Sequence, residues 1–280
     1  MRLVFEDIRY DVSGGIATIT LNRPDRLNAL RVRTFEELRD AFAQASADER
    51  VGVVVTNGEG RAFCAGGDIE MAQTLLTSEH AGRNHYFDRM IGVSDAILSM
   101  GKPVIFAVQG ACVGGGAELA LFADFVIAAE TAYFVFNGTE IGGCSWWGGP
   151  QLLPVLVGMR RAEEILYLSK RVRADEAAAI GLVTRTVPAG ELETATDEVC
   201  QRILDLSEEG VRLTKAGLRS TKQLLLATMS VHAELNVGAL GKPDLHAAFD
   251  AFLEGRKMSW RDLRPGFAEE PTAGGVRNEP

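Results

Sequence analysis

Two glycine-rich segments, each placed after a short apolar run, constrain the fold more than any other feature of the sequence. Residues 61–68 (RAFCAGGD) follow the run VGVVV at 51–55, and residues 110–118 (GACVGGGAE) follow PVIFAV at 103–108. Such runs are typical of strands buried on both faces of a sheet. A predicted helical stretch ending near residue 99 separates the two units. This alternation of strand, glycine-rich turn and helix predicts an α/β fold with crossover helices and a mainly parallel sheet.

The N-terminal part predicts a β-hairpin and then a helix. Apolar runs at 3–10 and 16–21 flank the sequence SGG at 13–15, which is typical of a tight turn between paired strands. Thr34, with Glu37 three residues later, has the spacing of a capping box. The apolar residues that follow recur at helical spacing, so we expect a helix to about residue 45.

Helical periodicity dominates from residue 174 onward, with predicted segments near 190–206, 211–229 and 243–257. The last residues contain little that could be buried. We therefore expect three regions, which are a core over 1–190, a helical C-terminal region over 191–265 and a flexible tail over 266–280.

Charge and cysteine usage exclude several classes of function. With 38 acidic and 29 basic residues the net charge is −9, which argues against nucleic-acid or membrane partners. The four cysteines lack CxxC spacing and the four histidines form no HExxH pattern, so we expect a reduced, cytoplasmic protein without a metal. The longest apolar region, 104–129, is interrupted by Gln109, Glu118 and Asp124, and the N-terminus has no signal-peptide pattern.

The glycine-rich segments are candidates for binding an oxyanion. Loops that follow strands of an open α/β sheet lie where ligands bind, and glycine lets a ligand approach backbone N–H groups closely. Glu118 lies about one helical turn beyond Gly115, so its carboxylate can reach the same region. An apolar pocket would raise its pKa toward the range useful for acid–base catalysis. The alternatives are glycines that only form turns and a surface glutamate.

Five motifs, in this order, resemble the crotonase (enoyl-CoA hydratase/isomerase) superfamily. They are LNRP at 21–24 with NAL at 28–30, FCAGGD at 63–68, GGGAELA at 114–120 with Asp124, AIGLV at 179–183 and AFLEGRK at 251–257. The resemblance spans about residues 3–260. It implies the crotonase (ClpP-like) fold of repeated ββα units forming a spiral, and a helical C-terminal region that forms a homotrimer or a hexamer (dimer of trimers). It also implies an acyl-CoA substrate and no cofactor beyond that coenzyme A.

The resemblance assigns roles residue by residue. The two oxyanion donors fall on the backbone N–H groups of Gly67 and Gly115, and the first catalytic glutamate falls on Glu118. One such donor contributes roughly 3 kcal/mol to a transition state. The remaining positions match substrate and CoA contacts in the family, with Arg26 near phosphates: Arg26, Ala65, Gly66, Asp68, Ile69, Gly114, Phe252 and Lys257.

The sequence departs from the family at the second catalytic glutamate. An ungapped match places Gly138 there, whereas a pair of compensating gaps would place Glu140. The ungapped match is simpler and resembles ring-closing and ring-opening members, although those have an aspartate where Ser145 stands. Ser145 could position water or a substrate hydroxyl, and Trp146 with Trp147 could wall an acyl pocket, or these residues could be structural.

His85 and Tyr86 lie in a segment that often covers the acyl pocket in this family. Because polar residues flank them, an exposed helix face is the favoured interpretation.

The sequence therefore predicts an enzyme that stabilises the enolate of an acyl-CoA thioester, most simply for hydration or double-bond isomerisation. The second reaction class is hydrolytic C–C cleavage or ring closure and opening on a cyclic ketoacyl-CoA. A non-catalytic acyl-CoA-binding member is the alternative from another class. A P-loop is excluded because Gly116-Ala117 replaces the required Lys-Ser/Thr.

Overall fold

The computed structural model describes residues 4–240, 242–254, 256 and 258–261. Its strands are β1 (Ile8–Ser13), β2 (Ile16–Leu21), β3 (Val53–Gly58), β4 (Ala62–Cys64), β5 (Val104–Val108), β6 (Ala111–Val113), β7 (Phe125–Ala129), β8 (Tyr133–Val135), β9 (Val172–Arg173) and β10 (Arg185–Val187). Its helices are α1 (Val32–Ala47), α2 (Ile69–Thr77), α3 (His80–Ser99), α4 (Gly115–Ala120), α5 (Gly149–Val157), α6 (Met159–Tyr167), α7 (Ala174–Ala179), α8 (Leu192–Leu204), α9 (Glu208–Leu226), α10 (Met229–Ala239) and α11 (Pro243–Leu253), with 3-10 turns at Pro24–Arg26 and Ala189–Glu191.

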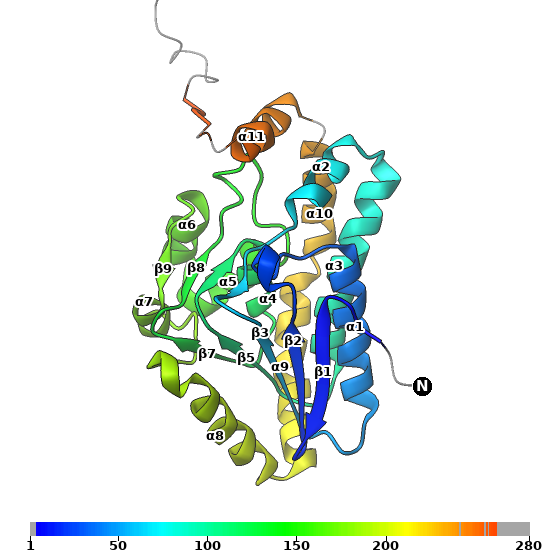
Figure 1. Cartoon of the computed structure of the whole chain (residues 1–280), viewed down its shortest axis with the longest axis vertical. Coiled ribbons are helices and arrows are strands. Elements are labelled where there is room, and N and C mark those ends of the chain that lie inside the picture. The colour runs from blue at the N-terminus through cyan, green and yellow to red at the C-terminus, as the bar shows by residue number, and fades with distance from the viewer. Residues whose placement is uncertain (1–3, 241, 255, 257, 262–280) are drawn as a thin grey trace, which may run out of the picture.

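The larger sheet has the strand order β1-β2-β3-β5-β7-β10 (Figure 1). The predicted hairpin is confirmed, since β1 and β2 pair antiparallel with Ile8 opposite Leu21. Every other pair in this sheet is parallel. The predicted α/β organisation with a mainly parallel sheet is therefore confirmed.

A second sheet, with the order β4-β6-β8-β9, is built from very short strands. The glycine-rich segments 61–68 and 110–118 were expected to form only turns, yet β4 lies within the first and β6 within the second. Three-residue strands depend on pairing with distant strands, which local sequence does not reveal. Strands β3, β5 and β7 of the first sheet are each followed along the chain by a short strand of the second, namely β4, β6 and β8, and this gives the predicted spiral of ββα units.

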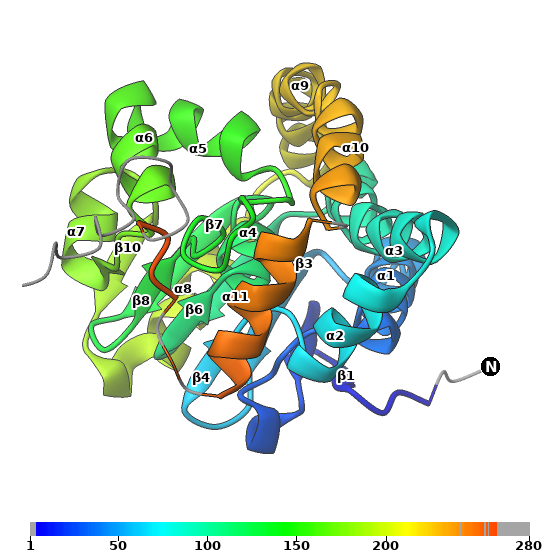
Figure 2. The same cartoon turned by 90° about the horizontal axis from the view of Figure 1, so that it is seen from above.

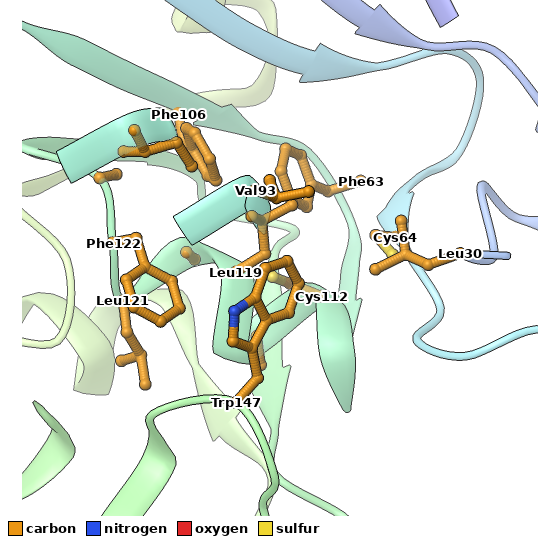
Figure 3. Close-up of a cluster of buried hydrophobic side chains, with 14 of the residues drawn as sticks. Leu30, Phe63, Cys64, Val93, Phe106, Cys112, Leu119, Leu121, Phe122 and Trp147 are labelled. Atoms are coloured by element: carbon orange, nitrogen blue, oxygen red, sulfur yellow. The ribbon is translucent and has the colours of Figure 1, made fainter. Parts of the chain in front are cut away.

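Apolar side chains from both sheets and the surrounding helices form the main core. Figure 3 shows Phe63 of β4 beside Phe106 of β5, whose ring centroids lie 5.6 Å apart. Trp147 is completely buried, with its ring 5.6 Å from that of Phe122. The segment after β8 is therefore anchored in the core by an aromatic side chain.

The predicted capping box between Thr34 and Glu37 at the start of α1 is wrong, because both side chains have other hydrogen-bond partners. Thr34 accepts a hydrogen bond from the N–H of Arg31, which is the N-cap residue. The Glu37 carboxylate instead accepts hydrogen bonds from the backbone N–H groups of Glu6 and Asp7, at 2.9 and 2.8 Å. Glu37 therefore ties α1 to the chain that leads into β1.

The part of the chain after β10 is helical within the described residues. Helices α8 and α9 follow one another, α9 gives way to α10 at Leu226 to Met229, and α11 ends at Leu253. Figure 2 shows α11 lying across the top of the molecule near α2. The predicted tail over 266–280 lies outside the described residues. No helix in the described ranges is long and apolar enough to span a membrane.

Candidate active site

A cavity of about 500 Å³ lies where the two glycine-rich segments meet the loop after β8. Helices α2, α3 and α11 also contribute to its wall. Most of the residues selected from the sequence line it, namely Arg26, Ala65, Gly66, Gly67, Asp68, Ile69, Gly114, Gly115, Glu118, Gly138, Ser145, Trp146 and Trp147. Residues separated by up to 121 positions in the chain are thus brought to one cavity.

The backbone around Gly67 is held by Leu30. The N–H of Leu30 donates to the carbonyl of Gly66 at 2.7 Å, and the N–H of Asp68 donates to the carbonyl of Leu30 at 2.8 Å. Because alternate groups of an extended chain point to opposite sides, the N–H of Gly67 points away from Leu30. That N–H makes no hydrogen bond to any described residue.

The N–H of Gly115 is the second free donor at this wall. Gly115 is the first residue of α4, and its N–H has no acceptor among the residues that the structure describes. A Cβ built on Gly115 would lie 4.0 Å from the nitrogen of Gly67. Two free N–H groups are therefore adjacent at the cavity surface, and such a pair can stabilise negative charge on one oxygen.

Close backbone contacts hold the two segments together. Gly66 has φ of +98°, and a Cβ there would lie 2.9 Å from the carbonyl oxygen of Val113. A Cβ on Gly116 would lie 2.7 Å from the Cβ of Cys64. Any other residue at either position would separate the segments, so these glycines fix the spacing of the two N–H groups.

Glu118 carries the only carboxylate in this cavity that is buried in apolar surroundings, among the residues described. Its relative exposure is 6%, and burial raises its pKa to about 7. The Ser145 hydroxyl and the N–H groups of Trp147 and Trp146 oppose this shift. The Ser145 hydroxyl has no partner with full hydrogen-bond geometry among the described residues, so its contact with Glu118 is weak. Glu118 can therefore accept or donate a proton near neutral pH.

Asp68 differs from Glu118 because it is engaged in a salt bridge. Its carboxylate lies 2.8 Å from Arg23 and also accepts a hydrogen bond from the N–H of Glu70 at the start of α2. Arg23 in turn donates to the carbonyl of Ala29. Asp68 thus fixes the segment that contains Gly67.

The two alternatives for a second glutamate are placed very differently. Gly138 lines the cavity, but a Cβ on it would lie 2.2 Å from the carbonyl carbon of Cys144. Glu140 is exposed and does not line the cavity. Its carbonyl accepts a hydrogen bond from Trp260 at 3.1 Å. In this arrangement neither position delivers a second carboxylate to the cavity.

Aromatic side chains form part of the cavity wall. Trp146 and Trp147 both line it, and Trp146 packs on Phe87 with ring centroids 5.6 Å apart. The expectation that His85 and Tyr86 share an exposed face is wrong for Tyr86, which is 5% exposed and lines the cavity. His85 is exposed. The polar residues around Tyr86 concealed its inward position.

The remaining predicted contacts lie at the cavity rim or outside the described residues. Arg26 and Ile69 line the cavity while staying solvent-exposed, and the Arg26 guanidinium lies 3.1 Å from Glu70. The side chain of Phe252 and the whole of Lys257 lie outside the described residues. Within the described part of the chain, no cluster of His, Cys, Asp and Glu side chains is suited to a metal ion.

Sequence reasoning did not single out several residues of the wall. Asn137 and Cys144 are polar members, while the apolar members come from four helices and from loops: Leu30, Phe35, Met71, Ala72, Leu75, Met90, Ile141, Leu240 and Phe249. Helical periodicity marks such apolar residues as buried but does not distinguish a core position from a cavity wall.

Comparison with known proteins identifies relatives over nearly the whole chain. Residues 11–264 match the family model for enoyl-CoA hydratase/isomerase. A crotonyl-CoA hydratase of Syntrophomonas wolfei is 34% identical over 260 residues, covering 92% of this chain and 99% of that protein. An enoyl-CoA hydratase structure from Mycobacterium avium subsp. paratuberculosis matches with a TM-score of 0.79 and 30% identity, covering 92% and 99%. A monofunctional enoyl-CoA isomerase from M. smegmatis matches with a TM-score of 0.67 and 35% identity, covering 78% and 94%.

Proposed function

Because this chain belongs to the enoyl-CoA hydratase/isomerase family, we propose that it catalyses hydration or double-bond isomerisation of an enoyl-CoA thioester. The observation that carries the proposal is the placement of two free N–H groups and one buried glutamate on a single cavity. The first feature suits a thioester oxygen and the second suits proton transfer beside it.

The N–H groups of Gly67 and Gly115 would form the oxyanion hole. When a nucleophile adds at C3, or a proton leaves the acyl chain, charge develops on the thioester oxygen. Two fixed donors in a site that excludes water stabilise that charge without reorganisation. The close packing of Gly66 and Gly116 supports this role, because it sets the donors before substrate binds.

Glu118 would act as the proton-transfer group beside this hole. With a pKa of about 7 it is present in both protonation states near neutral pH. In hydration its carboxylate would take a proton from the attacking water. In isomerisation it would move a proton between carbon atoms of the acyl chain. A protein that only binds acyl-CoA has no need of such a group, which disfavours the non-catalytic alternative.

Coenzyme A would lie across the rim of the cavity, and no other cofactor is needed for this chemistry. Ala65, Gly66 and Ile69 would contact the adenine end, and Arg26 would approach phosphate groups with its planar donors. The acyl chain would extend between Tyr86 and the two tryptophans. Phe252 and Lys257 remain candidates from the family resemblance.

We also propose that the chain assembles as a homotrimer or as a dimer of trimers. Large apolar side chains are exposed on α5, α6, α9 and α10 and directly after α6, including Tyr167, Leu168, Leu218, Leu224 and Leu235. Helix α5 contacts α6 and α9, and α9 contacts α10, so these side chains share a continuous helical region. Apolar surface of this extent is typical of a protein–protein interface.

The reaction can be identified with a small set of substrates in water enriched with ¹⁸O. Crotonyl-CoA, a 3-enoyl-CoA and a cyclic 2-ketoacyl-CoA would be incubated with wild-type protein and with Glu118→Gln, and products followed by mass spectrometry. A labelled 3-hydroxyacyl-CoA indicates hydration, and unlabelled 2-enoyl-CoA formed from the 3-enoyl substrate indicates isomerisation. Labelled ring-opened acid, with neither of these products, would contradict the proposal and favour the hydrolytic alternative.

A further inference from the structure

The loop after β8 fills the space that a side chain at position 138 would need. A Cβ on Gly138 would lie within 2.6 Å of three backbone atoms of Cys144. The N–H of Gly143 donates to the carbonyl of Gly138 at 2.8 Å, which closes the loop on itself. Cys144 and Ser145 therefore stand on the cavity wall where this family's second carboxylate is expected.

Cys144 differs from the other three cysteines of the chain. Cys64, Cys112 and Cys200 are completely buried, whereas Cys144 is partly exposed and lines the cavity. Its Sγ donates to Oδ1 of Asn236 at 2.6 Å and lies 3.4 Å from Nε2 of His232. Both partners come from one face of α10, four residues apart, and Asn236 is 4% exposed. The thiol of Cys144 thus lies between two polar side chains of α10.

The Asn236 amide is oriented by the helix itself, and the His232 imidazole contacts the sulfur through Nε2. The amide of Asn236 donates to the carbonyl of His232 at 2.8 Å, and Nδ1 of His232 is buried without a partner among the described residues. In the tautomer that carries its proton on Nε2, the imidazole can donate to the sulfur when the thiol loses its proton.

Resting on the function proposed above, we propose that Cys144 is the second proton-transfer residue of the site and that its thiol protonates the α-carbon of the enolate. His232 and Asn236 act on the sulfur and are positioning residues. This assignment gives the cavity the second proton-transfer group that hydration requires and that neither Gly138 nor Glu140 supplies.

The proton balance can be followed through one hydration cycle. Glu118 takes a proton from water as the water oxygen bonds to C3, and the electrons of the C2–C3 double bond move onto the thioester oxygen. When the enolate collapses, C2 takes the proton of the Cys144 thiol and leaves a thiolate. The protonated Glu118 then returns one proton to that thiolate through water in the cavity, so both groups are restored.

The acidities of the two groups favour this order of events. Burial raises the pKa of Cys144 to about 11, and the charge of Glu118 adds to this shift, so the thiol is protonated when substrate binds. The pKa of Glu118 is about 7, so proton return from its carboxyl to the thiolate runs downhill. A nucleophilic role would need a thiolate in the resting state, which the raised pKa of Cys144 disfavours.

Alkylation tests the location of the thiol independently of any activity. Iodoacetamide at pH 8.5, followed by peptide mass spectrometry, is expected to modify Cys144 ahead of the three buried cysteines. Saturating butyryl-CoA, which cannot be hydrated, is expected to slow this modification at least fivefold. An unchanged rate with butyryl-CoA bound would overturn the inference, because the thiol would then lie away from the acyl chain.

Turnover in D₂O tests the chemical role. We expect Cys144→Ala to lower kcat for crotonyl-CoA about a hundredfold, with KM within threefold, and to lose stereospecific deuterium incorporation at C2. Cys144→Ser preserves the shape but is a weaker acid, so it should also be slow. Cys200→Ala, which removes a buried thiol on the far side of the larger sheet, is the control and should match wild type.

The outcomes separate this inference from the proposed function. Wild-type rates and deuterium stereochemistry in both Cys144 variants, with thermal stability retained, would overturn the inference alone. If the wild-type protein hydrates none of a series of 2-enoyl-CoA substrates from four to twelve carbons, this inference fails, whereas isomerisation of 3-enoyl-CoA would still support the proposed function.

Discussion

Glu118 lies in the first turn of α4, and residues 145–147 and the two glycine-rich segments line the same cavity around its carboxylate. Its position follows from the sequence, since it lies three positions after Gly115. Its environment does not, because the wall opposite comes from residues 145–147. The raised pKa is thus a property of tertiary structure that spacing alone could only suggest.

Replacing Glu118 tests its role in proton transfer. We expect Glu118→Gln to lower kcat about a hundredfold or more, because an amide of the same size cannot exchange the proton, while acyl-CoA binding is retained. Steady-state kinetics with the substrate identified above would measure this. Glu140→Gln is the matched control and should be close to wild type, since Glu140 is exposed outside the cavity. A large loss of kcat in Glu140→Gln, with kcat unchanged in Glu118→Gln, would mean that Glu140 and not Glu118 reaches the substrate.

The same substitution should also change how stability depends on pH. The pKa of Glu118 is raised from 4.5 to about 7 in the folded protein, so the folded state holds a proton that the unfolded state has lost between these values. Wild-type stability therefore falls as pH rises through this window, by up to about 3 kcal/mol. Glu118→Gln removes this loss.

Thermal unfolding of the two proteins from pH 4 to pH 8 would measure the effect. The unfolding temperature of the variant, relative to wild type, should rise between pH 4.5 and 7 and then level off. A difference that is constant over this range would show that the carboxyl does not titrate with a raised pKa.

At the scale of elements, the tight contact between Gly138 and Cys144 determines the shape of the loop after β8. We expect Gly138→Ala to destabilise the protein by about 2–4 kcal/mol, because its methyl group would overlap a backbone that cannot move without displacing buried Trp147. Chemical denaturation would measure this change. Gly217→Ala in α9, where a Cβ meets nothing within 4 Å, should stabilise by about 0.5–1 kcal/mol. Wild-type stability in Gly138→Ala would show that the loop can move to accommodate a methyl group at position 138.

The elements themselves were predictable to different degrees. The hairpin of β1 and β2 and the long strands β3 and β5 have apolar runs and turn residues that mark them locally. Strands β4 and β6 have three residues each and lie within glycine-rich sequence, so only their pairing with one another and with β8 defines them. Local patterns therefore predicted one sheet, and the spiral of ββα units with its second sheet was implied only by the family resemblance.

The site shows the same division between local and long-range information. Gly67, Gly115 and Glu118 could be named because their motifs are compact. Cys144 could not, and Tyr86 was expected on an exposed face, since each reaches the cavity only through packing of its segment against distant parts of the chain. Tyr86, for example, packs against Phe35 of α1 with ring centroids 5.4 Å apart.

At the scale of the whole molecule, substitution of the exposed apolar side chains of α9 and α10 tests the proposed trimer or hexamer. Leu224 is 78% exposed and Leu235 is 70% exposed, although α9 packs Leu225 and Leu226 against the core and α10 packs Met229 and Val237 into it. We expect wild-type protein to have the mass of three or six chains by light scattering coupled to size exclusion. The double variant Leu224→Glu with Leu235→Glu should shift this mass toward one chain, because burying four or more added charges at repeated interfaces is costly. Leu206→Glu, between α8 and α9, is a control with a single exposed leucine outside that region and should keep the wild-type mass. A monomeric wild-type protein would contradict the proposed assembly without affecting the chemistry assigned to Glu118.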